Sequence, residues 1–295
     1  MLFRSQSAGV YNTFGSFNNF FGFNAGRKNT TGSNNNFFGN CAGFSNTTGG
    51  CNNFIGCRAG CTNTIGSNNN FIGHVAGSGN ISGNHNNFMG YQAGGTNTTG
   101  CYNNFFGLCA GFCNTTGNGN SFIGLCAGYA NTFGGYNVFF GCGAGKSNTT
   151  GGSNVFLGNT PGINNTTASN NIAIGLNAGQ TSGSPSGLIN FTTTGNQIVM
   201  GNANHTTACI QIAWGVASDI RYKCVWGNVP YGRDFLRGVN PIKYSFKDKE
   251  TGEVKDPRKR YGFSAQEVLS LEGDEPIIVN TSNPEYLGIT HDYMI

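Results

Sequence analysis

Residues 103–119, NNFFGLCAGFCNTTGNG, hold one unit of the repeat that decides the fold. The same arrangement of Asn, Phe and Gly returns every 17 residues, with the consensus N-N-F-[FI]-G-x-x-A-G-x-x-N-T-T-G-x-x and no insertion over about ten copies. One Gly stands at 22, 39, 56, 73, 90, 107, 124, 141, 158 and 175, and one Asn at 12, 29, 46, 63, 80, 97, 114, 131, 148 and 165. A fixed period of this kind indicates a repeat architecture.

The repeat unit predicts one coil of a β-solenoid. Seventeen residues with two or three Gly are too few for a pair of helices, and two short segments that we expect to be extended, N-N-F-F and N-T-T, alternate with Gly turns. Gly at fixed places permits corners with positive φ, and Asn side chains of successive coils can stack in ladders. With coils about 4.8 Å apart, ten of them make a rod of roughly 50 Å. The expected fold class is mainly β, a parallel β-roll or β-solenoid followed by a small α+β domain.

Two neighbouring rows of apolar residues run through the repeats. Adjacent residues of a strand point to opposite faces, so one row is expected inside the coil and the other outside. We interpret the row of nine Phe as outward-facing and buried by self-association, because nine exposed rings would form a very large apolar patch on a monomer. The alternative is a wider coil that takes both rows inside. The Phe row is Phe20, Phe37, Phe54, Phe71, Phe88, Phe105, Phe122, Phe139 and Phe156; the other is Phe21, Phe38, Ile55, Ile72, Met89, Phe106, Ile123, Phe140, Leu157 and Ile174.

Charge divides the chain into two unlike parts. Charged residues make up 9% of the sequence, against roughly 25% in ordinary globular domains. All 12 acidic residues lie at or after Asp219, and the only basic residues before it are Arg4, Arg27, Lys28, Arg58 and Lys146. The net charge of +4 gives no footprint for nucleic-acid binding. No run of 18 apolar residues occurs, and the N-terminus lacks the apolar core of a signal peptide, so we expect neither membrane insertion nor a secretion signal.

The array lacks the residues that several chemistries need. A glycosidase normally needs paired carboxylates and a calcium-binding β-roll needs Asp at its turns, and neither is available before Asp219. His74 and His85 occupy different repeat positions, so no metal site is predicted. No cofactor is expected either.

Cysteine usage favours free thiols in a reducing compartment. The 11 cysteines are an odd number, and those in the array stand at variable repeat positions. Cys57 with Cys61, and Cys109 with Cys113, are spaced C-x-x-x-C without an accompanying His or acidic ligand. A disulfide between Cys109 and Cys126, which share a repeat position, is the alternative.

A Thr row accompanies the array at Thr13, Thr30, Thr47, Thr64, Thr98, Thr115, Thr132, Thr149 and Thr166. It is interrupted at Ile81, and the neighbouring row mixes Thr with Phe14, Ile65 and Phe133. We interpret it as a structural ladder; a flat ice- or glycan-facing surface is the alternative.

The period ends after Gly179, and a different composition follows. One more coil-like piece stands at 196–201, and an apolar strand is expected at 209–214. Beyond it, the pattern predicts a short helix at 231–238, a strand at 241–247, a charged hairpin turn at 248–260 and a helix from Ser264 with a capping box.

The repeat resembles those of trimeric autotransporter adhesin heads, and more closely the 17-residue repeats of bacterial and viral tail-fibre proteins. The resemblance covers roughly residues 8–179 and implies a parallel trimer of β-rolls. After the array, three ordered motifs at 218–223, 240–244 and 260–268 resemble the endosialidase-type intramolecular chaperone domain. That resemblance implies a domain that assembles the trimer and then cuts itself off. The expected domains are a fibre at 1–179, a β-rich connector at 180–217 and the chaperone at 218–295.

The resemblance implies that Ser218 and Lys223 form the active pair. A neutral Lys amine can deprotonate a Ser hydroxyl if burial lowers its pKa. The cut is expected beside Ser218, with Ala217–Ser218 favoured and the other side of Ser218 left open. The alternative is that Ser218 and Asp219 only cap a helix. The chain departs from the family at 286–295, where a long C-terminal helix would be expected. The residues there have no heptad pattern that could form a coiled coil.

These observations predict a trimeric fibre or appendage protein for host attachment, whose enzyme activity is at most a single-turnover Ser-Lys self-cleavage. The expected partners are two further copies of the chain, an attachment point on a virion or cell surface, and a host-surface glycan or receptor. The expected location is a virion, after assembly in a reducing host cytoplasm. The alternatives are an adhesin on the bacterial cell surface and an ice- or glycan-binding solenoid without proteolysis.

Overall fold

The computed structural model describes residues 2–3, 5–180, 192–202, 233–245, 247, 252–254, 259–272, 279–280 and 287–289. These residues fall into two compact units, one up to residue 202 and the other from residue 233 onward. Each unit is described by itself. Ala217, Ser218, Lys223 and the expected strand at 209–214 lie outside the described residues.

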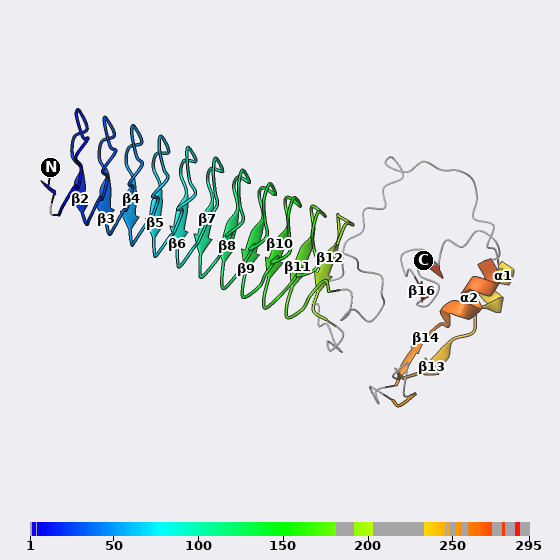
Figure 1. Ribbon diagram of the computed structural model, residues 1–295. Helices are drawn as coiled ribbons and strands as arrows, with labels where there is room; N and C mark the ends of the chain where they lie inside the picture. The colour runs from blue at the N-terminus through cyan, green and yellow to red at the C-terminus, as the bar shows by residue number, and fades with distance from the viewer. Residues whose placement is uncertain are drawn as a thin grey trace, which may run out of the picture. The chain divides into compact units, whose positions relative to one another are not determined.

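The first unit is a parallel β-solenoid with one short strand per coil (Figure 1). Its twelve strands pair in chain order and form a single sheet, which confirms the predicted fold class. They are β1 (Leu2–Phe3), β2 (Asn19–Phe21), β3 (Asn36–Phe38), β4 (Asn53–Ile55), β5 (Asn70–Ile72), β6 (Asn87–Met89), β7 (Asn104–Phe106), β8 (Ser121–Ile123), β9 (Val138–Phe140), β10 (Val155–Leu157), β11 (Ile172–Ile174) and β12 (Ile198–Met200).

The strand register follows the repeat. Phe88 lies beside Phe71 on one side and Phe105 on the other, so each residue pairs with its equivalent 17 positions away. The last pairing, of Ile172 with Ile198, spans 26 residues, and β12 thereby joins the sheet after the period has ended. The coil-like piece expected at 196–201 therefore belongs to the same sheet.

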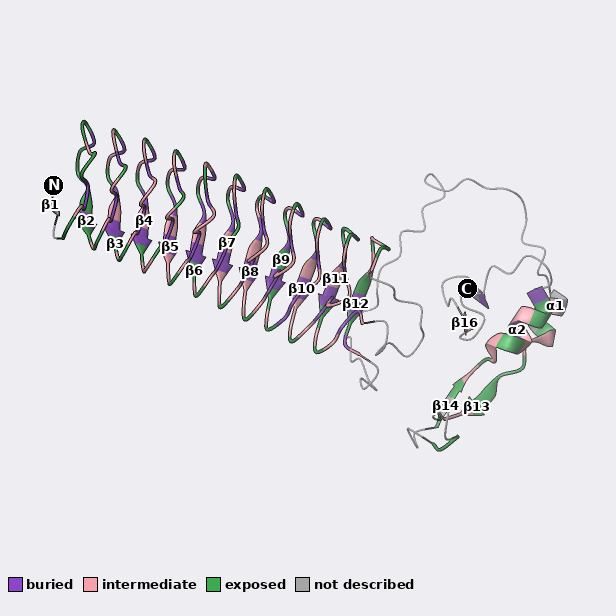
Figure 2. Ribbon diagram, viewed as in Figure 1, coloured by how far each residue is buried: buried purple, intermediate pink, exposed green. Residues whose placement is uncertain are grey.

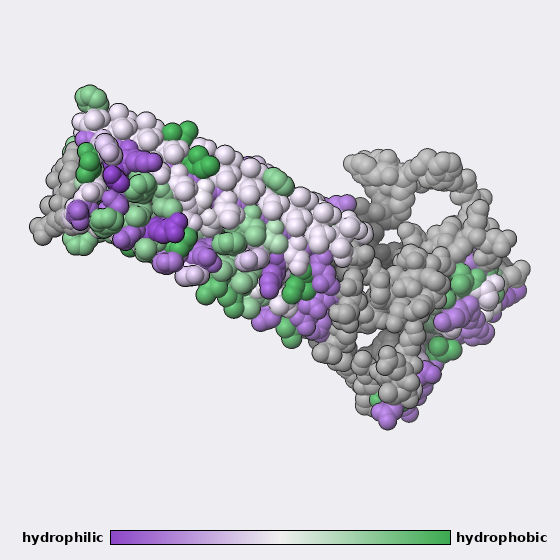
Figure 3. Space-filling model, viewed as in Figure 1, coloured by the Kyte–Doolittle hydropathy of each residue, from purple (hydrophilic) through white to green (hydrophobic). Residues whose placement is uncertain are grey.

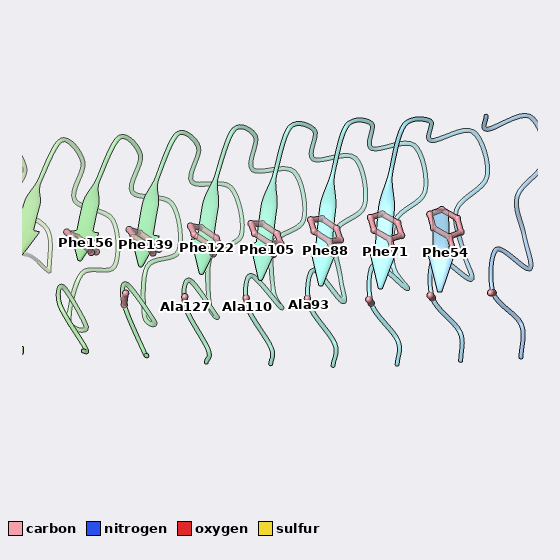
Figure 4. Close-up of a cluster of buried hydrophobic side chains, with 14 of the residues drawn as sticks. Phe54, Phe71, Phe88, Ala93, Phe105, Ala110, Phe122, Ala127, Phe139 and Phe156 are labelled. Carbon is pink, nitrogen blue, oxygen red and sulfur yellow. The ribbon is translucent and has the colours of Figure 1, made fainter. Parts of the chain in front are cut away.

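The row of nine Phe lies inside the solenoid, so the prediction that it faces outward is wrong. All nine rings are fully buried. Neighbouring rings stack with centroids 4.7–5.0 Å apart and planes within 5–9° of parallel (Figure 4). The spacing between strands thus sets the spacing between rings. Burial of each ring stabilises the fold by about 1.5–3 kcal/mol.

The interior is one ring wide, which also overturns the alternative of a wider coil. The wall opposite the rings consists of fully buried Ala and of Gly: Ala93 is fully buried, and a Cβ placed on Gly94 would lie 2.4 Å from the Phe88 ring. Because Gly has no side chain, the ring can lie directly on its backbone. Met89, the next residue after Phe88, is 44% exposed. The burial pattern of the strands alternates accordingly, with the central residue buried (Figure 2).

Two fully buried Asn columns complete the interior. Asn46 shows the pattern of the first column: its Nδ2 donates to Asn29 Oδ1 at 2.6 Å and to the carbonyl of Gly49 at 2.9 Å, and its Oδ1 accepts from Asn63 Nδ2. In the second column, Asn35 Nδ2 donates to the same Gly49 carbonyl, and Asn35 Oδ1 accepts from the backbone N–H of the next coil. Paired in this way, the amides avoid the desolvation cost of a buried polar group.

Unpaired interior amide atoms occur where the period breaks. Asn165 Oδ1 and Asn171 Nδ2 are buried without a hydrogen-bond partner among the described residues. Both lie shortly before β11, the last strand before the longer connection to β12. The Asn ladder therefore depends on uninterrupted repetition, which explains why the same Asn recurs in each regular coil.

The N-T-T segment is not a second strand, contrary to the expectation of two extended segments per coil. Instead, three successive N–H groups converge on one carbonyl of the next coil: Thr30, Thr31 and Gly32 all donate to Thr47 O at 2.9–3.2 Å. Thr hydroxyls add to this contact; Thr30 Oγ1, for example, donates to Thr47 O at 3.1 Å. The hydroxyls thus bridge successive coils, which supports the interpretation of a structural ladder.

Four residues per coil have positive φ, and Gly supplies two of them, as predicted. In the second coil these are Gly22 at 135° and Gly26 at 55°. The other two are usually not Gly, for instance Asn24 at 57° and Asn34 at 59°. Even the β-branched Val75 takes a left-handed φ of 61° at one of these positions, a conformation that β-branched residues rarely adopt.

The second unit is a small α+β arrangement. Its elements are α1 (Arg233–Gly238), β13 (Ile242–Tyr244), β14 (Arg260–Gly262), α2 (Ala265–Glu272), β15 (Val279–Asn280) and β16 (Gly288–Ile289). β13 pairs antiparallel with β14, and β15 with β16. Val268 of α2 and Val279 of β15 are buried together, with Phe235 and Leu287 among the residues packed against them. Both helices and the strand within 241–247 lie where the sequence predicts them.

Candidate functional site

The outer face of the solenoid sheet is the first candidate site, because it exposes apolar side chains along the array. The third residue of each three-residue strand points outward. Phe21 is 51% exposed, Phe140 55% and Met200 61%. This column, here called the third-position column, is Phe21, Phe38, Ile55, Ile72, Met89, Phe106, Ile123, Phe140, Leu157, Ile174 and Met200. It is a row of mixed aromatic and aliphatic residues rather than the uniform Phe row.

The first residue of each strand forms a parallel column on the same face, and its character changes along the array. In the N-terminal half this residue is Asn, and the amides form a ladder on the outer face. Asn36 Nδ2 donates to Asn53 Oδ1 at 2.7 Å, and Asn87 Nδ2 donates to Asn104 Oδ1 at 2.8 Å. From β8 onward the residues are Ser121, Val138, Val155, Ile172 and Ile198. The sequence analysis missed this change, although a comparison of the second Asn of the consensus across the repeats would have detected it.

A further column, two residues after each strand, extends the apolar surface in part of the array. Tyr91, Leu108, Leu125 and Leu176 are each 48–53% exposed. Neither of the two strand columns nor this column contains an Asp, Glu, Lys or Arg in the described coils. Figure 3 shows hydrophobic side chains gathered in patches along the array. The face is therefore suited to contact with another uncharged surface rather than with an ionic ligand.

The two array histidines take part in ring stacking. His74 stacks on Tyr91 with centroids 5.3 Å apart, and His85 stacks on Tyr102 at 4.9 Å. Within the part of the chain that the structure describes, no group of three His, Cys, Asp or Glu residues could hold a metal ion. Across the same described ranges, no helix has the length and apolar character needed to cross a membrane.

The nine cysteines of the array are free thiols in the structure, including Cys109 and Cys126. Burial raises the pKa of the Cys109 thiol, and the neighbouring Cys126 raises it further. Burial also raises the pKa of Cys113. The reactive species is the thiolate, so both thiols have a smaller reactive fraction at a given pH.

We expect Cys109 and Cys113 to react with iodoacetamide severalfold more slowly at pH 8 than Cys51, which is exposed. The difference should narrow as the pH rises, because a higher pH populates the thiolates that burial disfavours. Mass spectrometry of timed alkylation gives the rate at each cysteine. Unfolding in guanidinium is the control, and it should make the three rates similar. Equal rates in the folded protein would contradict this expectation.

The second candidate site is the segment that contains the three ordered motifs. Ser218 and Lys223 of the first motif lie outside the described residues, as does Ala217. The structure brings the second and third motifs together: β13 pairs with β14, and Asn240 Nδ2 donates to Glu267 Oε1 at 2.7 Å. The aromatic ring of Tyr244 lies over Gly262, where a Cβ would be 3.1 Å from Tyr244 Cε1.

The expected capping box of α2 is half formed. Ser264 Oγ accepts from the backbone N–H of Glu267 at 3.4 Å, as an N-cap should. The Glu267 carboxylate bonds Asn240 instead of closing the reciprocal arm of the box. Glu267 therefore joins α2 to the segment just before β13.

Residues 218–272 match the family model described as chaperone of endosialidase. The match begins at the Ser218 motif and ends with α2. No curated protein and no solved structure matches the chain.

Proposed function

We propose that the chain is the structural subunit of a trimeric fibre or appendage and that its C-terminal segment is an intramolecular chaperone for assembly. The observation that carries this proposal is the chaperone-of-endosialidase match at 218–272, which follows a β-solenoid along the chain. A solenoid of near-identical coils has a folding problem that such a chaperone would solve. Non-local pairing is slow, and a slip of one coil preserves most contacts.

Host attachment is the role proposed for the fibre, with a virion as its location. Support comes from the shape of the coil stack and its surface, which carries few charged residues; both suit a stiff projecting element. An ice-binding role is less well supported. Such a role needs free hydroxyls on a flat face, whereas hydroxyls of the Thr row donate to carbonyls of the next coil, as Thr47 does to Thr64 and Thr115 does to Thr132.

Autoproteolysis beside Ser218 is part of the proposal. The Ser218 Oγ would attack the carbonyl carbon of Ala217 while the neutral Lys223 amine takes the hydroxyl proton. The Ala217–Ser218 C–N bond breaks as an ester forms, and water then hydrolyses that ester. The products are the fragments 1–217 and 218–295. Because the Lys223 amine must lose solvent to be neutral, cleavage is expected only in the assembled trimer.

The experiment that tests the proposed function compares intact mass with native mass. The freshly expressed full chain should give a native mass of three array fragments, and a denaturing analysis should find fragment 1–217. Ser218→Ala should leave the full-length chain uncut and still trimeric. Lys223→Ala should do the same, since it removes the proposed base.

Two outcomes separate the parts of this proposal. A folded monomer at all concentrations would refute the trimeric fibre. A trimer that contains only the intact 295-residue chain would refute the proteolysis and leave the chaperone role standing.

A further inference from the structure

The outer sheet face has two unlike ends. In the first-position column, Asn19 to Asn104 are outward amides, of which each of the first five donates to the next across a 2.7–2.8 Å hydrogen bond. The last four strands place Val138, Val155, Ile172 and Ile198 there instead, with Val138 41% and Ile198 58% exposed. In these strands, β9–β12, both outward positions are apolar. The four first-position residues and Phe140, Leu157, Ile174 and Met200 are here called the apolar end.

The apolar end is costly to leave in water. Contiguous exposed apolar residues of this kind mark interaction sites, whereas isolated ones do not. At the other end, the outer amides from Asn19 to Asn104 would lose their contacts with water if another surface covered them. An apolar surface would offer them no hydrogen bonds in exchange. Contact with another surface is therefore more favourable at the apolar end than at strands β2–β7, which carry Asn19 to Asn104 and are here called the Asn end.

The repeat spacing favours a second copy of this chain as the occupant. Side chains on the face recur at the spacing between strands, about 4.8 Å, and a parallel copy presents side chains at the same spacing. The face has no charged residue among the described columns, so nothing in it selects an ionic partner. Twelve strands with three columns offer roughly 50 Å by 15 Å, about 750 Å². The whole face is therefore close to the approximately 800 Å² per partner of a standard interface, and the four strands of the apolar end supply about a third of it.

We propose that the apolar end is the surface through which copies of this chain anchor to one another in parallel, and that the Asn end contributes little to this association. The inference rests on the proposed function in taking further copies of the chain as the partner. It adds the location of the contact. It also gives the array a marker of register, because a slip of one coil would set Val138 of one copy against Ser121 of another.

The test is the full chain with Val138→Asn, Val155→Asn and Ile172→Asn together. Six other coils have Asn at this position, so the substitutions are compatible with a folded coil. Sedimentation equilibrium over a concentration series should show the dissociation constant raised by about 100-fold or more, as the loss of three apolar contacts implies. Circular dichroism should stay unchanged. The single variant Val155→Asn should give a smaller shift in the same direction, which keeps the test valid should the triple variant misfold.

The matched control removes three exposed apolar side chains from other columns of the solenoid, in coils that lie outside the apolar end. Ile65, Ile81 and Phe133 are 45–63% exposed in columns where the consensus has Thr, and we expect Ile65→Thr, Ile81→Thr and Phe133→Thr to leave association unchanged. Equal weakening by both triple variants would overturn the proposal, because it would mean that general surface hydrophobicity drives association. Association of the Asn variants at wild-type strength would also overturn it while leaving the fibre function intact. A wild-type chain that never associates would refute the proposed function itself.

Discussion

Replacing Phe105 by alanine is expected to lower the free energy of unfolding of the array by about 3–5 kcal/mol. The Phe105 ring is fully buried, with the Phe88 and Phe122 rings stacked on its two sides at 4.7 and 4.8 Å. Alanine would leave a cavity in a one-ring-wide interior. The neighbouring coils cannot close this cavity without breaking the strand spacing. Guanidinium unfolding followed by circular dichroism gives the change, measured at fixed protein concentration because association adds apparent stability.

The adjacent Phe106 provides a control of identical chemistry. It stands on the same strand, β7, but its side chain lies on the outer face and is only partly buried. Phe106→Ala should cost about 1 kcal/mol or less in the dissociated chain, since surface substitutions usually have small effects. Equal losses for the two variants would mean that both Phe side chains are buried to the same extent, and the assignment of inner and outer rows would then fail.

The sequence predicted the solenoid but could not say which aromatic row is inside. Period-two alternation places Phe105 and Phe106 on opposite faces without distinguishing the faces. The usable signal was uniformity within the chain. The inner row is Phe in nine regular coils, because a stack of rings needs rings of equal size. The outer row varies among Phe, Ile, Met and Leu, because solvent or a partner surface tolerates different shapes.

The N-T-T segment shows a second limit of the sequence pattern. Thr favours strands, and a run of Asn, Thr and Thr suggests an extended segment. In the structure, the carbonyl of Thr47 accepts from three successive N–H groups of the preceding coil, a tight turn that propensity alone does not reveal. Similarly, the left-handed conformation of Val75 is imposed by the repetition of the coil and not by the residue.

The candidate sites could also be predicted only in part from the sequence. The three motifs around 218–268 were visible as a resemblance, and the family match covers the same stretch. The assignment of Ser218 and Lys223 as an active pair depends on that resemblance and is tested by the cleavage variants. The apolar end was not foreseen, because it is a change within one column and disappears when the repeats are averaged into a consensus.

Replacing Gly145 by alanine is expected to destabilise the array by about 2–5 kcal/mol. Gly145 has a φ of 56°, and left-handed backbone costs a residue with a Cβ about 1–2 kcal/mol. In addition, the new Cβ would lie 2.4 Å from Phe139 Cε2, inside the ring stack. The ring cannot retreat, because neighbouring rings lie 4.8 and 4.9 Å away on its two sides, and overpacking of this kind costs about a further 1–3 kcal/mol.

Gly143, in the same coil, separates these two contributions. Its φ is 62°, but a Cβ there would meet only Thr160, with Cγ2 at 3.0 Å, and no ring. Other coils place Asn24, Cys41 or Arg58 at the equivalent position with similar φ values. Gly143→Ala should therefore show only the backbone contribution of about 1–2 kcal/mol. Guanidinium unfolding of both variants measures the difference, which isolates the cost of intruding on the ring stack. A Gly145→Ala variant no less stable than Gly143→Ala would show that the rings have room to move, and the one-ring-wide interior would have to be abandoned.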